Sequence, residues 1–175
     1  TITVEVEGEM VLNNGVSKRD SFSMTRVFEF SGPEKDEVIN SDFFIGNSSR
    51  YKGRGAEIFA RQVEVLRQAG YKSISTVAAK NGGYNGYYTW ARLGYEPALK
   101  SEDKQFAKKY KDDTGSQVSG LREIMSSEEG RQWWKVNGEA FGAKFNLAKS
   151  SKSSKTLDAY MKERKKKDGK EKRFE

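Results

Sequence analysis

The feature that most constrains the fold is a strand-helix-strand pattern in the first half of the chain. Residues 38–46, "VINSDFFIG", form a largely apolar extended run, which is typical of a strand at the centre of a sheet. Apolar residues then recur at helical spacing over 56–66, and Gly70 follows as a C-terminal cap before a next strand at 72–79, "KSISTVAA". This order predicts a βαβ unit, in which two parallel strands are joined by a right-handed helical crossover.

Further elements are expected on both sides of this unit. They are, in chain order, strands at 2–6 and 22–30 separated by an Asn-Gly turn signal at 13–15, a helix at 101–110, a helix that carries Trp133 and Trp134, and a late edge strand over 141–147. Ser126 and Glu129 have the spacing of a capping box for the tryptophan helix, which Gly138 should end. We expect the two tryptophans to pack in a core or an interface rather than to form a ligand cage. The pattern as a whole predicts an α/β fold.

Composition restricts the chemistry. The chain has no cysteine and no histidine, which excludes disulfides, thiolate nucleophiles and the usual zinc sites. Any acid–base chemistry therefore falls to Asp, Glu, Tyr, Lys or a bound water. No apolar run approaches the roughly 20 residues that span a bilayer, and the first ten residues have no signal-peptide character. We therefore expect a soluble protein with no membrane partner and no metal.

The positive charge is concentrated at one end of the sequence. Residues 149–175 hold eleven Lys or Arg against five Asp or Glu, a net charge of +6, which leaves +1 for the other residues. This segment opens with "KSSKSSK", a polar linker by composition, and continues with Leu157, Tyr160, Met161 and Arg164 at helical spacing. Two interpretations stay open: a solvated, partly helical or flexible tail, or an electrostatic arm for nucleic acid or another anionic partner.

The glycine segment between strand and helix has the composition of an anion site. In "RYKGRGAEIF", residues 50–59, two glycines allow close approach of a ligand, and the first amides of the helix are unpaired. A pyrophosphate is the natural occupant. A Walker loop is excluded because its G-x-x-x-x-G-K-[ST] pattern is absent, and a dinucleotide fingerprint is excluded because Ile58 stands where a third glycine is required.

The pattern that remains, Arg50-x-x-Gly53-x-Gly55-Ala56, resembles the Q/R-x-x-G-x-G/A signature of the GNAT superfamily of N-acetyltransferases. In that family the loop binds the pyrophosphate of acetyl-CoA, which serves as co-substrate. The resemblance implies a set of cofactor-binding residues at the end of the preceding strand and in the loop: Phe44, Ile45, Arg50, Lys52, Gly53, Arg54, Gly55 and Ala56.

A second segment, "NGGYNGYYTWARLGYEP" at 81–97, resembles the second signature of the same family, a short helix that ends in Gly-Phe or Gly-Tyr. The resemblance covers about residues 38–97. It implies a mixed β-sheet flanked by helices, with a GNAT-like domain over 1–148, a helical insertion at about 100–138 and the basic tail at 149–175. A weaker similarity, carried by "EEGRQWWKVNGEAFGAKFNL" at 128–147, is to acetyltransferase-like domains of tailed phages and prophages.

The resemblance also indicates where a catalytic acid would lie. In the family a tyrosine four residues before the Gly-Phe pair protonates the departing thiolate, and here that position is Trp90, whose indole is not a useful acid. Tyr87 lies on the same helical face as Trp90 and is the preferred substitute, with Tyr88 as the alternative. The general base would be Asp42 or Glu29 on the early strands, or a water.

Two function classes follow. The first is an acyl-CoA-binding N-acetyltransferase that acts on an unidentified amine in the cytoplasm of a bacterial host. The second is a non-catalytic GNAT-like component of a phage particle, whose basic tail contacts nucleic acid or another virion protein. The glycine segment favours the first class, whereas Trp90 and the insertion favour the second.

Overall fold

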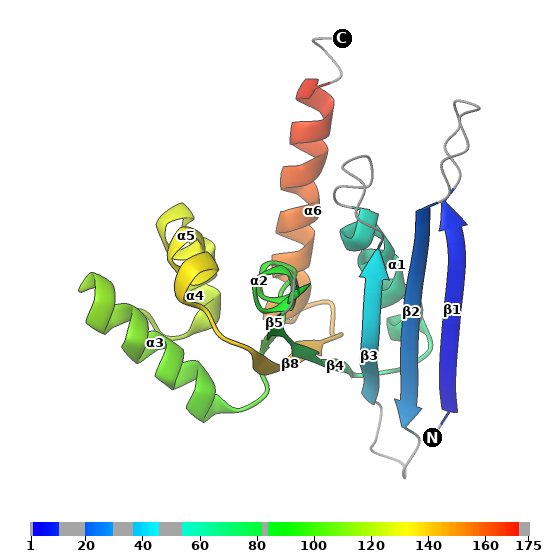
Figure 1. Cartoon of the computed structure of the whole chain (residues 1–175), viewed down its shortest axis with the longest axis horizontal. Helices are drawn as coiled ribbons and strands as arrows, with labels where there is room; N and C mark the ends of the chain where they lie inside the picture. Colours follow the sequence, from blue (N-terminus) through cyan, green and yellow to red (C-terminus); the bar gives the residue numbers. More distant parts are fainter. Residues whose placement is uncertain (1, 11–19, 30–36, 46–53, 82–83, 172–175) are drawn as a thin grey trace. The chain divides into compact units, whose positions relative to one another are not determined.

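The computed structural model describes residues 2–10, 20–29, 37–45, 54–81 and 84–171 (Figure 1). The chain has the α/β fold that the sequence predicts, with an open mixed sheet flanked by helices. It divides into two units, Thr1–Ile74 and Ser75–Glu175, and each is described by itself. Among the described residues, no helix is both long enough and apolar enough to cross a membrane.

Three antiparallel strands begin the first unit. They are β1 (Ile2–Met10), β2 (Asp20–Glu29) and β3 (Glu37–Ile45), hydrogen-bonded in that order. All three strands agree with the sequence prediction, because alternating and apolar extended runs are strong strand signals. The predicted turn at 13–15 lies outside the described residues.

Helix α1 (Arg54–Gln68) packs against β3. The Gln62 side chain donates a 3.0 Å hydrogen bond to that of Asn40, a residue of β3 that is only 2% exposed. The helix buries a stripe at spacings of three and four residues, formed by Ala56, Phe59, Val63 and Leu66. It is followed by Gly70, the C-terminal cap that the sequence predicts. The cap is a Schellman motif: Gly70 has φ +89°, and the amides of Gly70 and Tyr71 donate back to the last turn.

The second unit contains most of the helices. Its elements are β4 (Ser73–Ala78, whose first two residues belong to the first unit), β5 (Lys80–Asn81), β6 (Tyr84–Asn85), α2 (Gly86–Arg92), β7 (Glu96–Pro97), α3 (Lys100–Thr114), α4 (Leu121–Ser126), α5 (Glu128–Asn137), β8 (Phe141–Asn146) and α6 (Lys152–Glu171). Strand β8 lies between β4 and β7. The prediction that it is an edge strand is therefore wrong, because the two-residue β7 pairs with its outer side.

An aromatic core joins the helices of this unit to β8. Residues of β8 alternate between buried and exposed, and its inward side chains include Phe141 and Phe145. Trp134 is 1% exposed, and its ring meets Phe106 of α3 edge-on at a centroid distance of 4.9 Å. The indole N–H of Trp134 donates to the carbonyl of Tyr87 at 3.0 Å. Trp134 is thus a core residue, as the sequence predicts.

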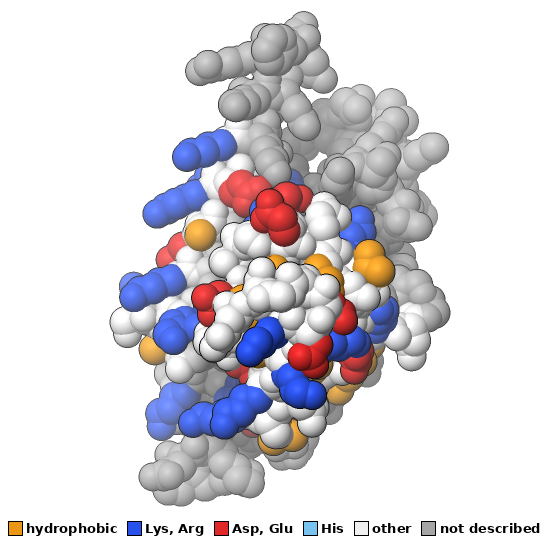
Figure 2. All heavy atoms as spheres, turned by 90° about the vertical axis from the view of Figure 1, so that its left-hand side faces the viewer, with side chains coloured by type: hydrophobic (Ala, Val, Ile, Leu, Met, Phe, Trp, Pro, Cys, Tyr) orange, Lys and Arg blue, Asp and Glu red, His pale blue; other side chains and the backbone are white. Residues whose placement is uncertain are grey.

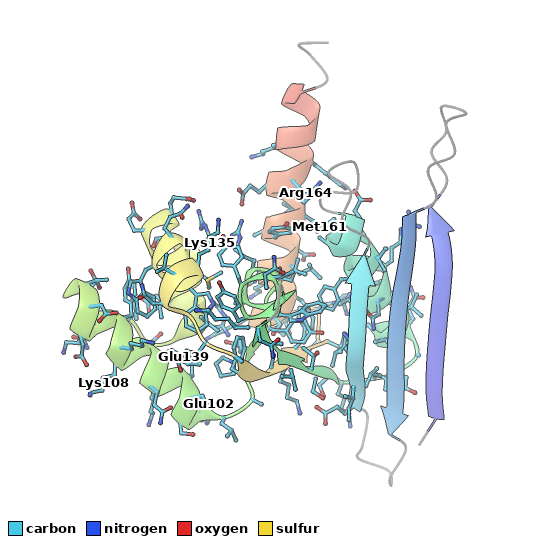
Figure 3. The ribbon with its side chains drawn as sticks, viewed as in Figure 1. Glu102, Lys108, Lys135, Glu139, Met161 and Arg164 are labelled. Atoms are coloured by element: carbon cyan, nitrogen blue, oxygen red, sulfur yellow. The ribbon has the colours of Figure 1, made fainter. Side chains whose placement is uncertain are left out.

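Polar contacts fix the helices of the 100–138 segment. The Asp103 carboxylate accepts a 2.7 Å hydrogen bond from the first amide of α4, at Leu121. Lys109 of α3 forms an ion pair with Glu139, which follows the end of α5 and is labelled in Figure 3. The cap of α5 is Ser127, whose hydroxyl accepts from the Gly130 amide at 2.9 Å. The capping box predicted at Ser126 is therefore one residue out of register.

The start of α6 is anchored and does not form the linker that its composition suggests. Ser153 and Ser154 are 1% and 3% exposed, and Leu157 is 3% exposed. The Ser151 hydroxyl accepts from the Ser154 amide at 3.0 Å and donates to the Asn146 carbonyl at 2.8 Å. Small serines fit here because the helix backbone lies directly against the body of the unit. The serines at 151, 153 and 154 thus contribute to packing, whereas the lysines of the same segment are exposed.

Candidate functional site

The glycine segment lies partly within the described residues. Arg50, Lys52 and Gly53 lie outside them. Arg54 is the first residue of α1, Gly55 is half-buried and Ala56 is buried in the first turn. The first amides of an α-helix have no partner within the helix, and the helix dipole favours negative charge at this end. The described part of the segment is thus the N-terminal turn of a helix, and its role as an anion site stays a prediction.

The strand that leads to this segment contains an irregularity at a candidate residue. Thr25 of β2 pairs with Asp42, whereas the next residue, Arg26, pairs with Asn40, so Ser41 is an extra residue in β3. A bulge of this kind bends the strand and increases its twist, and bulges are common beside active sites. Asp42 follows the bulge directly, whereas the other candidate base, Glu29, is at the end of β2 opposite Glu37. The remaining predicted residues of the strand, Phe44 and Ile45, pair with Ser23 and Phe22.

The end of α2 explains the second signature in structural terms. Gly94 has φ +100°, its amide donates to the Ala91 carbonyl at 3.2 Å, and the Tyr95 amide donates to the Trp90 carbonyl at 3.0 Å. This is a Schellman motif, in which the residues at the positions of Trp90 and Tyr95 commonly make a hydrophobic contact. Here their rings lie 5.1 Å apart, and Trp90 is 8% exposed. Trp90 therefore serves to close the helix.

Tyr87 is also held by the surrounding structure. Its hydroxyl donates a 2.6 Å hydrogen bond to the carbonyl of Lys135, a residue of α5 that is labelled in Figure 3. The ammonium of Lys80 lies 4.9 Å from the Tyr87 ring centroid. The side chain is 8% exposed. The hydroxyl proton that a catalytic acid would deliver is thus engaged by a backbone carbonyl. Tyr88 is half-buried, and its hydroxyl forms no hydrogen bond with any residue that the structure describes.

The predicted site residues are distributed over both units. Asp42, Phe44, Ile45 and the start of α1 belong to the first unit, whereas Tyr87 and Tyr88 belong to the second. Within the described ranges, no group of three or more acidic residues could hold a metal ion.

The structure also contains a pocket in the second unit that the sequence did not indicate. It has a volume of about 490 Å³ and lies among α2, β7, α4, α5 and α6. The signal for it in the sequence is a stripe of α6 residues at helical spacing, Lys152, Lys155, Thr156, Ala159, Tyr160 and Glu163. The composition predicted a linker over part of this stripe, so the helical spacing was not recognised.

Comparison with known proteins adds no relative. No family model matches the chain, and neither a curated protein nor a solved structure matches it.

Proposed function

We propose that the chain is an acyl-CoA-binding N-acetyltransferase of the GNAT type, which transfers an acetyl group from acetyl-CoA to an amine. The observation that carries this proposal is the position of Gly55 and Ala56 in the first turn of α1, directly after β3 and the glycine segment. Unpaired amides and the positive end of the helix dipole suit the pyrophosphate of CoA. The basic residues Arg50, Lys52 and Arg54 would add charge to the same segment.

The bulge in β3 supports a catalytic role for the same strand. In the proposed reaction the amine nitrogen forms a bond to the thioester carbonyl carbon while a base accepts the amine proton. The C–S bond then breaks, and the CoA thiolate leaves and takes up a proton. Asp42, directly after the extra residue Ser41, is the candidate base.

Binding of CoA is tested with a charge introduced at the helix start. Gly55→Asp adds a side chain and a negative charge beside the first amides of α1, so it should abolish CoA binding measured by isothermal titration calorimetry. Gln68→Asp is the matched control, because it adds the same charge to an exposed position at the opposite end of α1. If CoA fails to bind the unmodified chain, or if both variants bind it equally, the proposal is wrong.

A second candidate function is a non-catalytic GNAT-like component of a phage particle. The observation in its favour is that the two residues nearest the family's acid position have structural contacts: Trp90 packs on Tyr95, and Tyr87 donates to the Lys135 carbonyl. In this alternative the exposed lysines of α6, among them Lys162 and Lys165, would contact nucleic acid or another virion protein.

The two candidates differ in turnover. Release of free CoA from acetyl-CoA should be measured with polyamines, aminoglycosides and lysine peptides as acceptors. If the chain is an enzyme that uses Tyr88 as acid, Tyr88→Phe should reduce turnover by roughly 10²- to 10⁴-fold without changing CoA affinity. The same loss from Tyr87→Phe alone would restore Tyr87 as the acid. CoA binding without turnover on any acceptor would favour the structural component.

A further inference from the structure

The pocket in the second unit has the size of a small-molecule site. Its volume of about 490 Å³ lies within the range of roughly 300–1,000 Å³ that ligand pockets occupy. In Figure 1, α6 and the α4–α5 pair stand on either side of α2. The pocket lies among these helices, and residues of α2 and β7 complete its lining.

Helix α6 supplies one wall of the pocket. The residues that it contributes follow the spacing i, i+3, i+4, i+7, i+8 and i+11 from Lys152, which places them on a single helical face. The wall is fixed at its base, because the Gly94 backbone approaches the Ser153 carbonyl so closely that a Cβ on Gly94 would lie 2.5 Å from that oxygen. Leu157, which is 3% exposed, lies outside this stripe and secures the helix from its other side.

Basic groups outnumber acidic groups around the pocket. The side chains that line it include five cations and two carboxylates, namely Arg92, Arg122, Arg131, Lys152 and Lys155 against Glu96 and Glu163. Figure 2 shows many basic side chains along the left edge and the lower part of the face that it presents, with acidic and further basic side chains over the rest. A concave surface with an excess of one charge concentrates its field within the cavity.

The arginines of the pocket are held in place by protein contacts. Arg92 forms an ion pair with Glu163 at 3.2 Å, and its guanidinium lies 5.1 Å from the ring centroid of Tyr160. Arg122 forms an ion pair with Glu96, and burial holds the pKa of Arg122 below its usual range. These two pairs neutralise both carboxylates that line the pocket.

Arg131 is also paired, with Glu128 of α5 at 2.6 Å, and it donates to the carbonyls of Met125 and Ser126 at 3.3 and 3.2 Å. The two lysines therefore carry the excess charge of the lining. Lys152 and Lys155 are exposed, and neither has an acidic partner within the described part of the chain. Their ammonium groups are therefore available to a ligand.

Apolar surface completes the lining. Ala91, Met125 and Ala159 contribute only apolar side-chain atoms, and Tyr160 contributes a half-buried ring. A pocket with a largely apolar wall and a few convergent charged groups selects a ligand with an apolar body and a charged end.

We propose that this pocket binds a small organic anion, whose carboxylate, sulfonate or phosphate group lies at Lys152 and Lys155 and whose planar apolar body lies along Tyr160 and Ala159. The proposal is independent of acetyl-CoA binding, because it involves neither α1 nor the glycine segment. It assigns to the first turns of α6 a binding role in addition to packing.

The test uses two fluorescent probes that share an apolar body and differ in charge. They are 8-anilinonaphthalene-1-sulfonate, an anion, and N-phenyl-1-naphthylamine, which is neutral. The full chain is titrated with each probe well below its melting temperature. We expect one site for the anion and an affinity for it that falls as salt is raised.

Two double variants of equal charge locate the site. Lys152→Glu with Lys155→Glu reverses both free cations, and Lys162→Glu with Lys165→Glu makes the same change at exposed positions of the same helix outside the pocket. The first pair should weaken binding of the anionic probe by about tenfold or more and change binding of the neutral probe by less than about twofold. The second pair should leave the affinity for the anionic probe within about threefold of that of the unmodified chain.

A third variant tests occupation of the cavity itself. Ala159→Trp places a large side chain on the stripe that faces the pocket and should reduce binding of both probes, while circular dichroism shows an unchanged fold. The proposal is overturned if the anionic probe does not bind, if both charge variants affect it equally, or if Ala159→Trp leaves the affinities unchanged.

Discussion

Replacement of Gly94 by alanine tests the packing of α6 more directly than any other single change. Gly94 has φ +100°, a backbone conformation that costs an L-residue about 1–2 kcal/mol. The added Cβ would also lie 2.5 Å from the Ser153 oxygen and 3.2 Å from the Thr156 Cβ, and this overpacking costs about 1–3 kcal/mol more. Gly94→Ala should therefore reduce the free energy of unfolding by about 2–5 kcal/mol.

Gly115→Ala is the matched control. Gly115 also has a left-handed backbone, with φ +75°, but a Cβ there would meet no described heavy atom within 4 Å. Gly115→Ala should therefore reduce the free energy of unfolding only by the cost of the left-handed backbone, about 1–2 kcal/mol. The difference between the two variants measures the contact between the end of α2 and α6.

Urea denaturation followed by tryptophan fluorescence provides the assay. All three tryptophans, Trp90, Trp133 and Trp134, belong to the second unit, so the signal reports unfolding of the unit that contains both glycines. If Gly94→Ala destabilises this unit no more than Gly115→Ala does, α6 does not pack at Gly94 and the argument for an anchored helix fails.

The remaining predictions concern α6 and an exposed carboxylate. Deletion of residues 150–175 should lower the melting temperature of the second unit, whereas deletion of 167–175 should change it much less, because Ser153, Ser154 and Leu157 all precede residue 167. Leu157→Ala should cost about 2–5 kcal/mol of unfolding free energy in the same urea assay, and a loss close to zero would show that the helix is detached. Hydrogen bonds from the Ser119 amide and hydroxyl, at 2.7 and 2.8 Å, hold the pKa of Glu123 below its usual range. The ionised carboxylate therefore stabilises the fold above its unfolded pKa, and this stabilisation is lost as the pH falls through the folded pKa. Glu123→Gln should therefore flatten the dependence of the melting temperature on pH between about pH 5 and 3, and an unchanged profile would contradict this assignment.

The elements that the sequence predicted correctly are those with strong local patterns. The alternation of β8 and the apolar stripe of α1 each repeat over several residues, and Gly70 marks a helix end through its left-handed backbone. Gly138 ends α5 with an extended backbone, and a Cβ there would lie 2.5 Å from the Trp134 carbonyl oxygen. The errors have a different origin. Strand β7 has only two residues, Glu96 and Pro97, too few for any periodic signal, and without it β8 looked like an edge.

The interpretation of "KSSKSSK" as a linker was wrong because serine is found both in linkers and in tight packing contacts. Ser and Lys are typical of linkers by composition, but a small side chain that hydrogen-bonds to a nearby backbone can also lie in a tight contact. The Ser153 hydroxyl accepts from the Asn146 amide at 3.3 Å, and the backbone of the same residue lies against Gly94. Its partner at Gly94 is distant in sequence, so no local pattern could indicate the contact.

The choice between Tyr87 and Tyr88 as the catalytic acid also depended on a contact between residues that are distant in sequence. Helical spacing placed Tyr87 on the face of Trp90 and so made it the preferred acid. The hydrogen-bond partner of Tyr87 is the carbonyl of Lys135, 48 residues later in the chain. The face shared with Trp90 is the one that packs in the core, since Trp90 contacts Tyr95 and Tyr95 contacts Phe145. The prediction of Tyr87 as the catalytic acid, made because it lies near the family's acid position, therefore chose a buried residue with a structural role.

Because of this packing, the two signatures do not support acetyl-CoA binding equally. Gly94 and Tyr95 are required by the fold of this chain: the glycine adopts a left-handed backbone and makes room for α6, and the tyrosine closes the Schellman motif against Trp90. A motif with a complete structural role would persist whether or not the chain binds a cofactor. Of the glycine pair at 53 and 55, Gly55 lies in the first turn of α1, and Gly53 lies outside the described residues. The proposal of acetyl-CoA binding therefore depends on the start of α1, and Gly55→Asp tests it where a substitution at Gly94 would test only the fold.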